Sequence, residues 1–182
     1  MRPDGTGLAN LTENGDAWED VRPAWSPDGA QIAFFRWNLA AEADAPGGPV
    51  GLWVMNADGS DQRFVYAYEG PVVEDAPVWS PDGKLIALTL LKEGDYDVWV
   101  VPSGGGEAVN VSNLPGDDTG ISWSPDSTAL TFTNETEEGL WQIVAAADGS
   151  STYPLMPGEI TGYGAWSPVA EPAIASIDDP AP

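Results

Sequence analysis

A tryptophan-centred string recurs along the sequence, and it restricts the fold more than any other feature. Trp-Ser-Pro-Asp-Gly occurs at Trp25 and again at Trp79, Trp-Ser-Pro-Asp-Ser occurs at Trp123, and Trp-Ser-Pro occurs at Trp166. Self-similarity at a fixed interval is the mark of a repeat architecture. The intervals from Trp79 to Trp123 and from Trp123 to Trp166 are close to the roughly 40–45 residues of a repeat that consists of four β-strands.

The residues around each tryptophan predict two strands joined by a tight turn. Proline presets the second position of a turn, and Asp-Gly tolerates the backbone conformations that close it. Large and small side chains then alternate in Ile32–Phe34, Ile86–Leu88 and Leu130–Phe132. This two-residue period is that of a β-strand.

Two more strands are predicted in every unit. The third strands contain Leu52–Met55, Val98–Val101 and Leu140–Val144, and each is followed by a Gly-containing turn. Asp-Gly between apolar runs is a strong hairpin signal. The fourth strands contain Arg63–Tyr66, Ala108–Ser112 and Thr152–Leu155. We therefore expect an all-β protein, a partial β-propeller with three full four-stranded blades and partial blades at both ends.

The repeat resembles the TolB-type β-propeller repeat, a WD-like repeat of the Tol biopolymer-transport proteins. The strings Arg22–Gly29 and Ala76–Gly83 match the family pattern P-x-W-S-P-D-G closely. The third unit departs from it, because Ser127 replaces the turn glycine, and the fourth has lost Asp-Gly. The resemblance covers nearly the whole chain. It implies a binding scaffold in the periplasm or outside the cell.

The phase of the repeat predicts where each blade begins and ends. The expected segments are the end of a preceding blade at 1–12, whole blades at 17–66, 72–112 and 117–155, the start of a further blade at 160–177, and a tail at 178–182. Two accounts stay open. In the first, the chain is part of a larger propeller or of an oligomer that shares blades. In the second, its two ends meet and close a small ring. The incomplete blade set favours the first account.

The composition removes several classes of function. The chain contains neither cysteine nor histidine. Disulfides, thiolate metal sites, Ser-His-Asp triads and the commonest general base are therefore excluded. A net charge of −23, from 29 acidic and 6 basic residues, opposes binding to nucleic acid and to anionic lipid. No apolar run is long enough for a membrane helix, and the first residues lack the apolar core of a signal peptide.

Acidic pairs precede three of the repeat tryptophans and are the candidate binding residues. These pairs are Glu19 and Asp20, Glu74 and Asp75, and Asp117 and Asp118. Their place in the repeat predicts inter-blade loops near one mouth of the central channel. They cap turns, or they form an acidic ring that attracts Ca²⁺ or a basic segment of a partner. No calcium-loop motif is present, so we expect no cofactor, with Ca²⁺ as the alternative.

Most tryptophans recur in phase and are expected to pack between blades. Trp18 and Trp37 lie outside the repeat pattern, so the sequence predicts them as exposed aromatic contacts. The chain is accordingly expected to be a non-catalytic scaffold for a protein partner, with self-association as a way to complete the propeller. Two alternatives stay open. One is carboxylate-only catalysis, as in glycoside hydrolysis. The other is an accessory propeller of a prolyl oligopeptidase-like enzyme.

Overall fold

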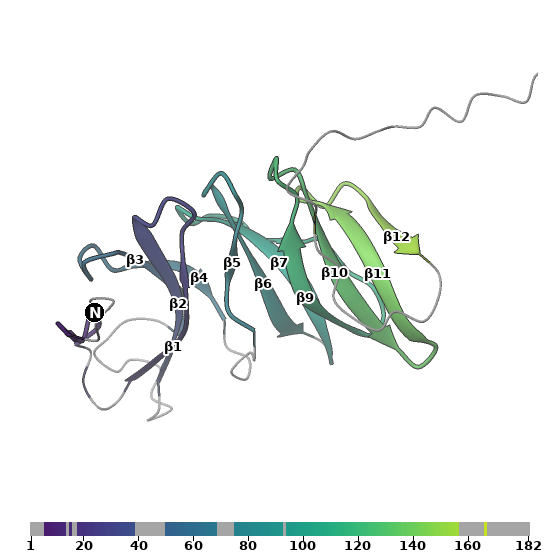
Figure 1. Ribbon diagram of the computed structural model, residues 1–182. Helices are drawn as coiled ribbons and strands as arrows, with labels where there is room; N and C mark the ends of the chain where they lie inside the picture. The colour runs from purple at the N-terminus through teal and green to yellow at the C-terminus, as the bar shows by residue number, and fades with distance from the viewer. Residues whose placement is uncertain are drawn as a thin grey trace, which may run out of the picture.

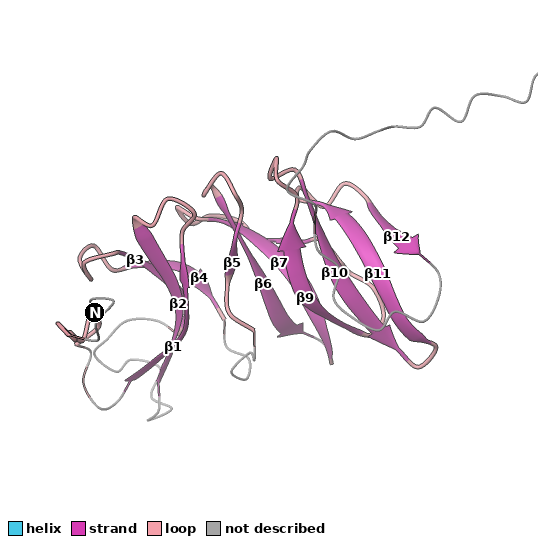
Figure 2. Ribbon diagram, in the orientation of Figure 1, coloured by secondary structure: helices cyan, strands magenta, loops and turns pink. Residues whose placement is uncertain are grey.

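The protein forms three four-stranded antiparallel sheets that follow one another along the chain. The computed structural model describes residues 6–13, 15, 18–38, 50–68, 75–92, 94–156 and 166. Strands and loops account for all of these residues, and no helix occurs among them (Figure 2). Accordingly, the described part of the chain contains no helix that could span a membrane. The predicted all-β fold with three four-stranded blades is confirmed.

Each sheet keeps its strands in chain order. The first contains β1 (Trp18–Trp25), β2 (Gln31–Asn38), β3 (Gly51–Asn56) and β4 (Arg63–Ala67). The second contains β5 (Val78–Trp79), β6 (Leu85–Lys92), β7 (Asp95–Pro102) and β8 (Val109–Asn110). The third contains β9 (Asp117–Trp123), β10 (Ala129–Thr136), β11 (Gly139–Ala146) and β12 (Thr152–Met156). These three sheets are blades 1, 2 and 3.

The blades stand side by side, from purple β1 to yellow-green β12 (Figure 1). The first strands of neighbouring blades, β1, β5 and β9, contact each other. Buried apolar side chains fill the spaces between sheets. Phe35 and Trp37 of blade 1 pack with Ile86 and Leu88 of blade 2, and a similar core joins blades 2 and 3. Face-to-face burial between successive sheets is therefore what holds this array together.

The Ser-Pro-Asp turn has the same hydrogen bonds in every blade. In blade 2, the Ser80 hydroxyl donates to Asp82 Oδ1 at 2.7 Å and accepts from the backbone N–H of Leu85 at 3.0 Å. Asp82 Oδ1 also accepts from the backbone N–H of Lys84 at 3.1 Å. These donors lower the pKa of Asp82 to about 2, with the Ser80 hydroxyl as the largest cause. The motif thus encodes a self-contained turn rather than a binding site.

Ser127 occupies the turn position where the other two blades have glycine. Its backbone is left-handed, with φ of 64°, as at Gly29 and Gly83, where φ is 69° and 72°. A side chain in this region is strained, because Cβ crowds the following backbone. Ser127 Oγ, however, accepts a hydrogen bond of 3.0 Å from the backbone N–H of Asp82 in blade 2. The departure from the repeat therefore adds a bond between blades.

The two roles of Ser127 can be separated by substitution. Ser127→Ala keeps the strained backbone and removes the acceptor for Asp82, so we expect the free energy of unfolding to fall by about 1–2 kcal/mol. Ser127→Gly removes the acceptor and the strain together, so it should cost less than alanine does. Urea denaturation measures both. An alanine variant as stable as the wild type would show that the hydrogen bond contributes nothing.

The repeat tryptophans connect successive blades by one recurring hydrogen bond. Trp79 Nε1 donates to the carbonyl of Ala24 at 3.1 Å, and Trp123 Nε1 donates to the carbonyl of Val78 at 2.9 Å. Trp166 Nε1 donates in the same way to Ser122, at 3.1 Å. Each acceptor directly precedes the tryptophan of the previous blade. Packing of tryptophans between blades is confirmed at Trp79 and Trp123, both 7% exposed.

The segment before blade 1 lies against the β3–β4 hairpin. Gln62 Nε2 donates to the Leu11 carbonyl at 2.8 Å, and a Cβ on Gly59, whose φ is +87°, would lie 2.9 Å from the same oxygen. Leu11 also packs against the buried cluster formed by Ile32, Phe34, Trp53 and Met55. The predicted segment 178–182 lies outside the described residues, as does 160–177 except for Trp166.

Candidate functional site

The two tryptophans outside the repeat pattern are buried, so the prediction that they are exposed contacts is wrong. Trp18 is 6% exposed and Trp37 is 9% exposed. Strand β2 continues to Asn38, which carries the alternation of Ala33 and Phe35 on to Trp37. There the Trp37 ring meets Tyr68 edge-on, with centroids 5.7 Å apart. Trp18 begins β1, paired with Asn38.

Four of the six acidic candidates lie in strands and not in inter-blade loops. Glu19 and Asp20 belong to β1, and Asp117 and Asp118 belong to β9. The ladder shifts register within each of these strands, and Arg22 and Gly120 have φ of 55° and 70° there. Each shift is a β-bulge, which interrupts the hydrogen-bond ladder locally, and pairing continues on both sides of it.

The remaining pair is described only in part. Asp75 lies in a bend before β5, where the Thr89 hydroxyl donates to its Oδ2 at 3.4 Å. Glu74 lies outside the described residues. Asp75 therefore stands in the link before β5, unlike the four residues in β1 and β9.

Asp20 forms a buried ion pair inside blade 1. Arg36 Nε and Nη2 donate to its two carboxylate oxygens at 2.7 and 2.9 Å. The same guanidinium lies over the Trp53 ring, 4.5 Å from the centroid. A two-pronged bond of this kind satisfies both charges away from water. Asp20 therefore stabilises the blade and is not available to a ligand.

Asp118 occupies the matching position in blade 3 without a cationic partner. Asp118 pairs with Asn134 across β9 and β10, as Asp20 pairs with Arg36, and Asn134 Nδ2 donates to Asp118 Oδ1 at 2.8 Å. Asp118 is 0% exposed, and its Oδ2 has no hydrogen-bond partner among the described residues. Burial raises the pKa of Asp118 to about 7, and the side chains of Ser112 and Asn134 offset only part of this effect.

The acidic candidates do not converge into a metal site within the described part of the chain. No group of three or more Asp or Glu side chains there is arranged to hold an ion. Asp117 Oδ1 already accepts a hydrogen bond of 3.0 Å from the backbone N–H of Tyr96. Ca²⁺ binding stays a prediction, which calorimetric titration of the whole chain would test.

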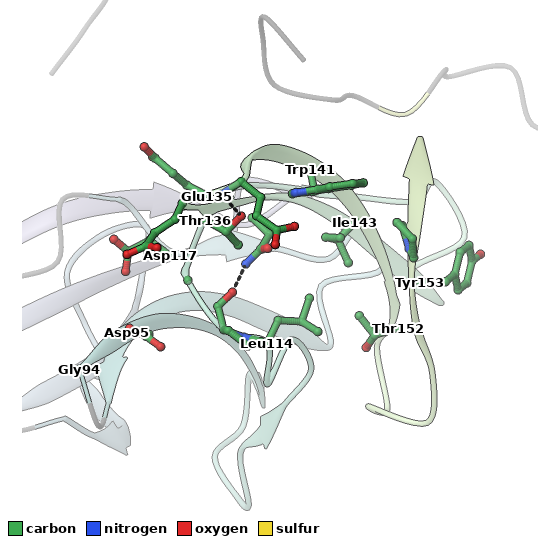
Figure 3. A pocket seen from close by; sticks show the side chains of 16 residues that line it. Gly94, Asp95, Leu114, Asp117, Glu135, Thr136, Trp141, Ile143, Thr152 and Tyr153 are labelled. Carbon is green, nitrogen blue, oxygen red and sulfur yellow. Dashed lines mark hydrogen bonds between the residues drawn. The ribbon is translucent and has the colours of Figure 1, made fainter. Parts of the chain in front are cut away.

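A cleft of about 760 Å³ opens between blades 2 and 3 (Figure 3). Its size is within the range of roughly 300–1,000 Å³ that ligand pockets occupy. Leu114, from the link between β8 and β9, and Trp141 and Ile143, from β11, form an apolar wall. Asp95 and Asp117 lie across the opening from Trp141 and Ile143 (Figure 3).

Carboxylates line the cleft from three separate segments. They are Asp95 at the start of β7, Asp117 at the start of β9, and Glu135, Glu137 and Glu138 around the β10–β11 turn. All five are exposed. No Lys or Arg occurs after Lys92 in the sequence, and none of the five forms an ion pair within the described residues. An apolar wall inside an acidic rim can bind a group that is positively charged at one end and apolar along its stem.

Sequence reasoning identified Asp117 but not the cleft that it lines. Glu135, Glu137 and Glu138 come from a hairpin turn, whereas the acidic pairs predicted from the sequence come from the links before each tryptophan. Two features of the sequence point to it. The string Glu-Thr-Glu-Glu-Gly interrupts two apolar strands, and no basic residue follows Lys92.

Comparison with known proteins agrees with the repeat and the sheets. The model of the TolB beta propeller domain matches residues 3–175. The chain belongs to the TolB β-propeller family. It is 34% identical to a protein TolB homolog from Chlorobium luteolum over 129 residues, which are 71% of this chain and 26% of that protein. The solved structure of TolB from Acinetobacter baumannii superposes with a TM-score of 0.60 at 20% identity, covering 81% of this chain and 35% of that one.

A peptidase also contains a segment similar to this chain. An uncharacterized peptidase from Bacillus subtilis is 28% identical over 118 residues, which are 64% of this chain and 17% of the peptidase. The chain thus spans about a quarter of the TolB homolog and less of the peptidase. These matches establish the propeller domain. They leave a scaffold and an accessory part of an enzyme as different functions for the same fold.

Proposed function

We propose that this TolB-type propeller chain is a non-catalytic module that binds a protein partner, in the periplasm or outside the cell. The observation that carries the proposal is the cleft between blades 2 and 3, where an apolar wall is combined with five exposed carboxylates. Protein interfaces join an apolar centre to a polar rim in this way. The acidic surface also favours encounter with a basic segment of the partner.

A second function is supported by the peptidase relative. In this alternative the chain is an accessory propeller beside a peptidase or another hydrolase, and the cleft faces that catalytic domain or its substrate. The 28% identity to the Bacillus subtilis peptidase favours it. The two functions differ in what lies against the cleft: an independent protein in the first, and a hydrolase domain in the second.

Site-specific photo-crosslinking distinguishes these functions. We expect benzoylphenylalanine placed at Glu138, which lines the cleft, to yield a discrete adduct with one protein in cells that produce the chain. The same photo-reactive group at Glu107, which is exposed and lies outside the cleft, is the matched control. Mass spectrometry identifies the adduct. A hydrolase domain in the adduct would favour the accessory function, and equal or absent adducts at both positions would contradict the binding proposal.

A further inference from the structure

In two blades, a basic side chain of the protein lies over the tryptophan of the third strand. Arg36 of β2 lies 4.5 Å from the ring centroid of Trp53 on β3. Lys92 of β6 lies 4.5 Å from the ring centroid of Trp99 on β7. In both cases the second strand supplies the cation and the third strand supplies the ring. Such contacts are attractive because the ring face carries negative charge density.

Blade 3 keeps the ring but has no cation. Trp141 lies on its third strand and packs against the apolar cluster between blades 2 and 3. It pairs with Asn134, whereas Trp53 pairs with Phe34, so the ring stands two residues earlier on its strand than in blade 1. The second strand β10 supplies Asn134 and Glu135 at its end, and no Lys or Arg follows Lys92 in the chain. Trp141 is only half-buried, and it lines the cleft together with the five carboxylates.

We propose that a Lys or Arg side chain of a partner polypeptide enters this cleft and lies over Trp141. This inference rests on the proposed function and names the chemistry that the cleft selects. The cation would make with Trp141 the kind of contact that Arg36 and Lys92 make with their rings, with its charge among the carboxylates of Asp117, Glu135 and Glu138. Its aliphatic stem would lie along Leu114 and Ile143. Long basic side chains bury their stems in this manner while the charged end stays near polar groups.

The charge distribution favours a polypeptide cation over a neutral ligand. Arg36 is neutralised by Asp20 at 2.7 Å within blade 1, whereas the carboxylates of the cleft have no basic partner among the described residues. Like charges gathered on a rim repel each other, and an entering cation relieves this repulsion. The partner segment should therefore carry a basic residue beside an apolar one.

Fluorescence anisotropy of a labelled pentapeptide tests the proposal. The probe is fluorescein-Gly-Lys-Leu-Lys-Gly-amide, and the control peptide has Glu in place of both Lys residues. We expect the basic probe to bind at least about tenfold more tightly than the acidic control, and the affinity to fall as salt is raised. Spermidine serves as a cation without a peptide backbone. Displacement by spermidine at the same concentration as unlabelled peptide would overturn the assignment to a polypeptide.

Matched variants locate the binding. The triple variant Glu135→Gln, Glu137→Gln and Glu138→Gln should weaken binding about tenfold, since each exposed ion pair contributes a small factor. The control triple variant is Glu13→Gln, Glu19→Gln and Glu107→Gln, which removes the same formal charge at exposed positions outside the cleft. It should weaken binding less than about twofold. Equal losses in the two triple variants would overturn the proposal.

Trp141→Leu keeps an apolar wall and removes the ring. We expect this substitution to lower the affinity for the basic probe by about threefold or more, while thermal unfolding shows that the variant is folded. An unchanged affinity would overturn the placement of the cation over the ring. If the crosslink at Glu138 forms but these variants leave peptide affinity unchanged, this inference fails and the binding function stands. If neither crosslink nor peptide binding is seen, both fail.

Discussion

The Trp79→Ala variant is expected to lose about 3–5 kcal/mol of the free energy of unfolding, the cost of removing a large aromatic side chain from a core. Trp79 is 7% exposed and belongs to the apolar cluster between blades 1 and 2. Its indole N–H also donates to the Ala24 carbonyl at 3.1 Å. Alanine would leave both a cavity and an unpaired carbonyl between two sheets. Urea denaturation of the purified chain measures the loss.

Trp25 provides a control within the same motif. It is 59% exposed, and no hydrogen bond to its ring nitrogen is seen within the described residues. Trp25→Ala should therefore cost less than about 1 kcal/mol, as is usual for a surface position. Trp79→Phe should give an intermediate loss, because it keeps most of the packing and removes the donor. Equal losses at Trp25 and Trp79 would contradict the view that contact with the preceding blade is what makes this residue important.

The contrast between Trp25 and Trp79 shows what the sequence can and cannot predict about the fold. Both tryptophans stand in the same string, so local pattern predicts the same turn and strands for both, and the structure has them. Burial depends instead on the sheet that lies alongside, which is distant in sequence. Trp37 shows the reverse case. Its position outside the repeat suggested exposure, but an extension of β2 places it in the core beside Tyr68.

The candidate site was predictable only in part, for a similar reason. The acidic pairs before each tryptophan are visible in the sequence, yet their roles are set by the residue opposite on the second strand. Arg36 neutralises Asp20, whereas Asn134 leaves Asp118 buried without a cation. The cleft draws on three segments that only the packing of blade 3 on blade 2 brings together. Composition could suggest its acidity but not its apolar wall.

Asp118→Asn is expected to gain stability relative to the wild type as the pH is raised from 4 to 8. The pKa of Asp118 rises from 3.8 to about 7 on folding, mainly because the carboxyl is buried. A raised folded pKa means that the neutral acid is favoured in the folded state. The stability associated with this group is therefore fully present below pH 3.8 and is lost as the pH rises through 7. Asparagine stays neutral throughout, and its side-chain oxygen can still accept from Asn134.

The expected gain in the free energy of unfolding follows from the size of the pKa shift of Asp118. Each pKa unit corresponds to about 1.4 kcal/mol, so a shift of about three units sets an upper limit near 4 kcal/mol at pH 8. The new amide N–H lies where Asp118 Oδ2 has no partner among the described residues, and an unpaired buried donor reduces the gain by about 1–3 kcal/mol. The informative quantity is thus the change in the variant's relative stability between pH 4 and pH 8, in which this pH-independent cost cancels.

Glu107→Gln serves as the control for the Asp118→Asn comparison, because it removes the same formal charge at an exposed position. Its stability relative to the wild type should stay nearly constant from pH 4 to pH 8, whereas that of Asp118→Asn should rise steadily between these values. Urea denaturation at several pH values measures both. Parallel curves for the two variants would mean that general charge repulsion, and not the buried carboxyl between blades 2 and 3, governs the pH dependence of this acidic propeller.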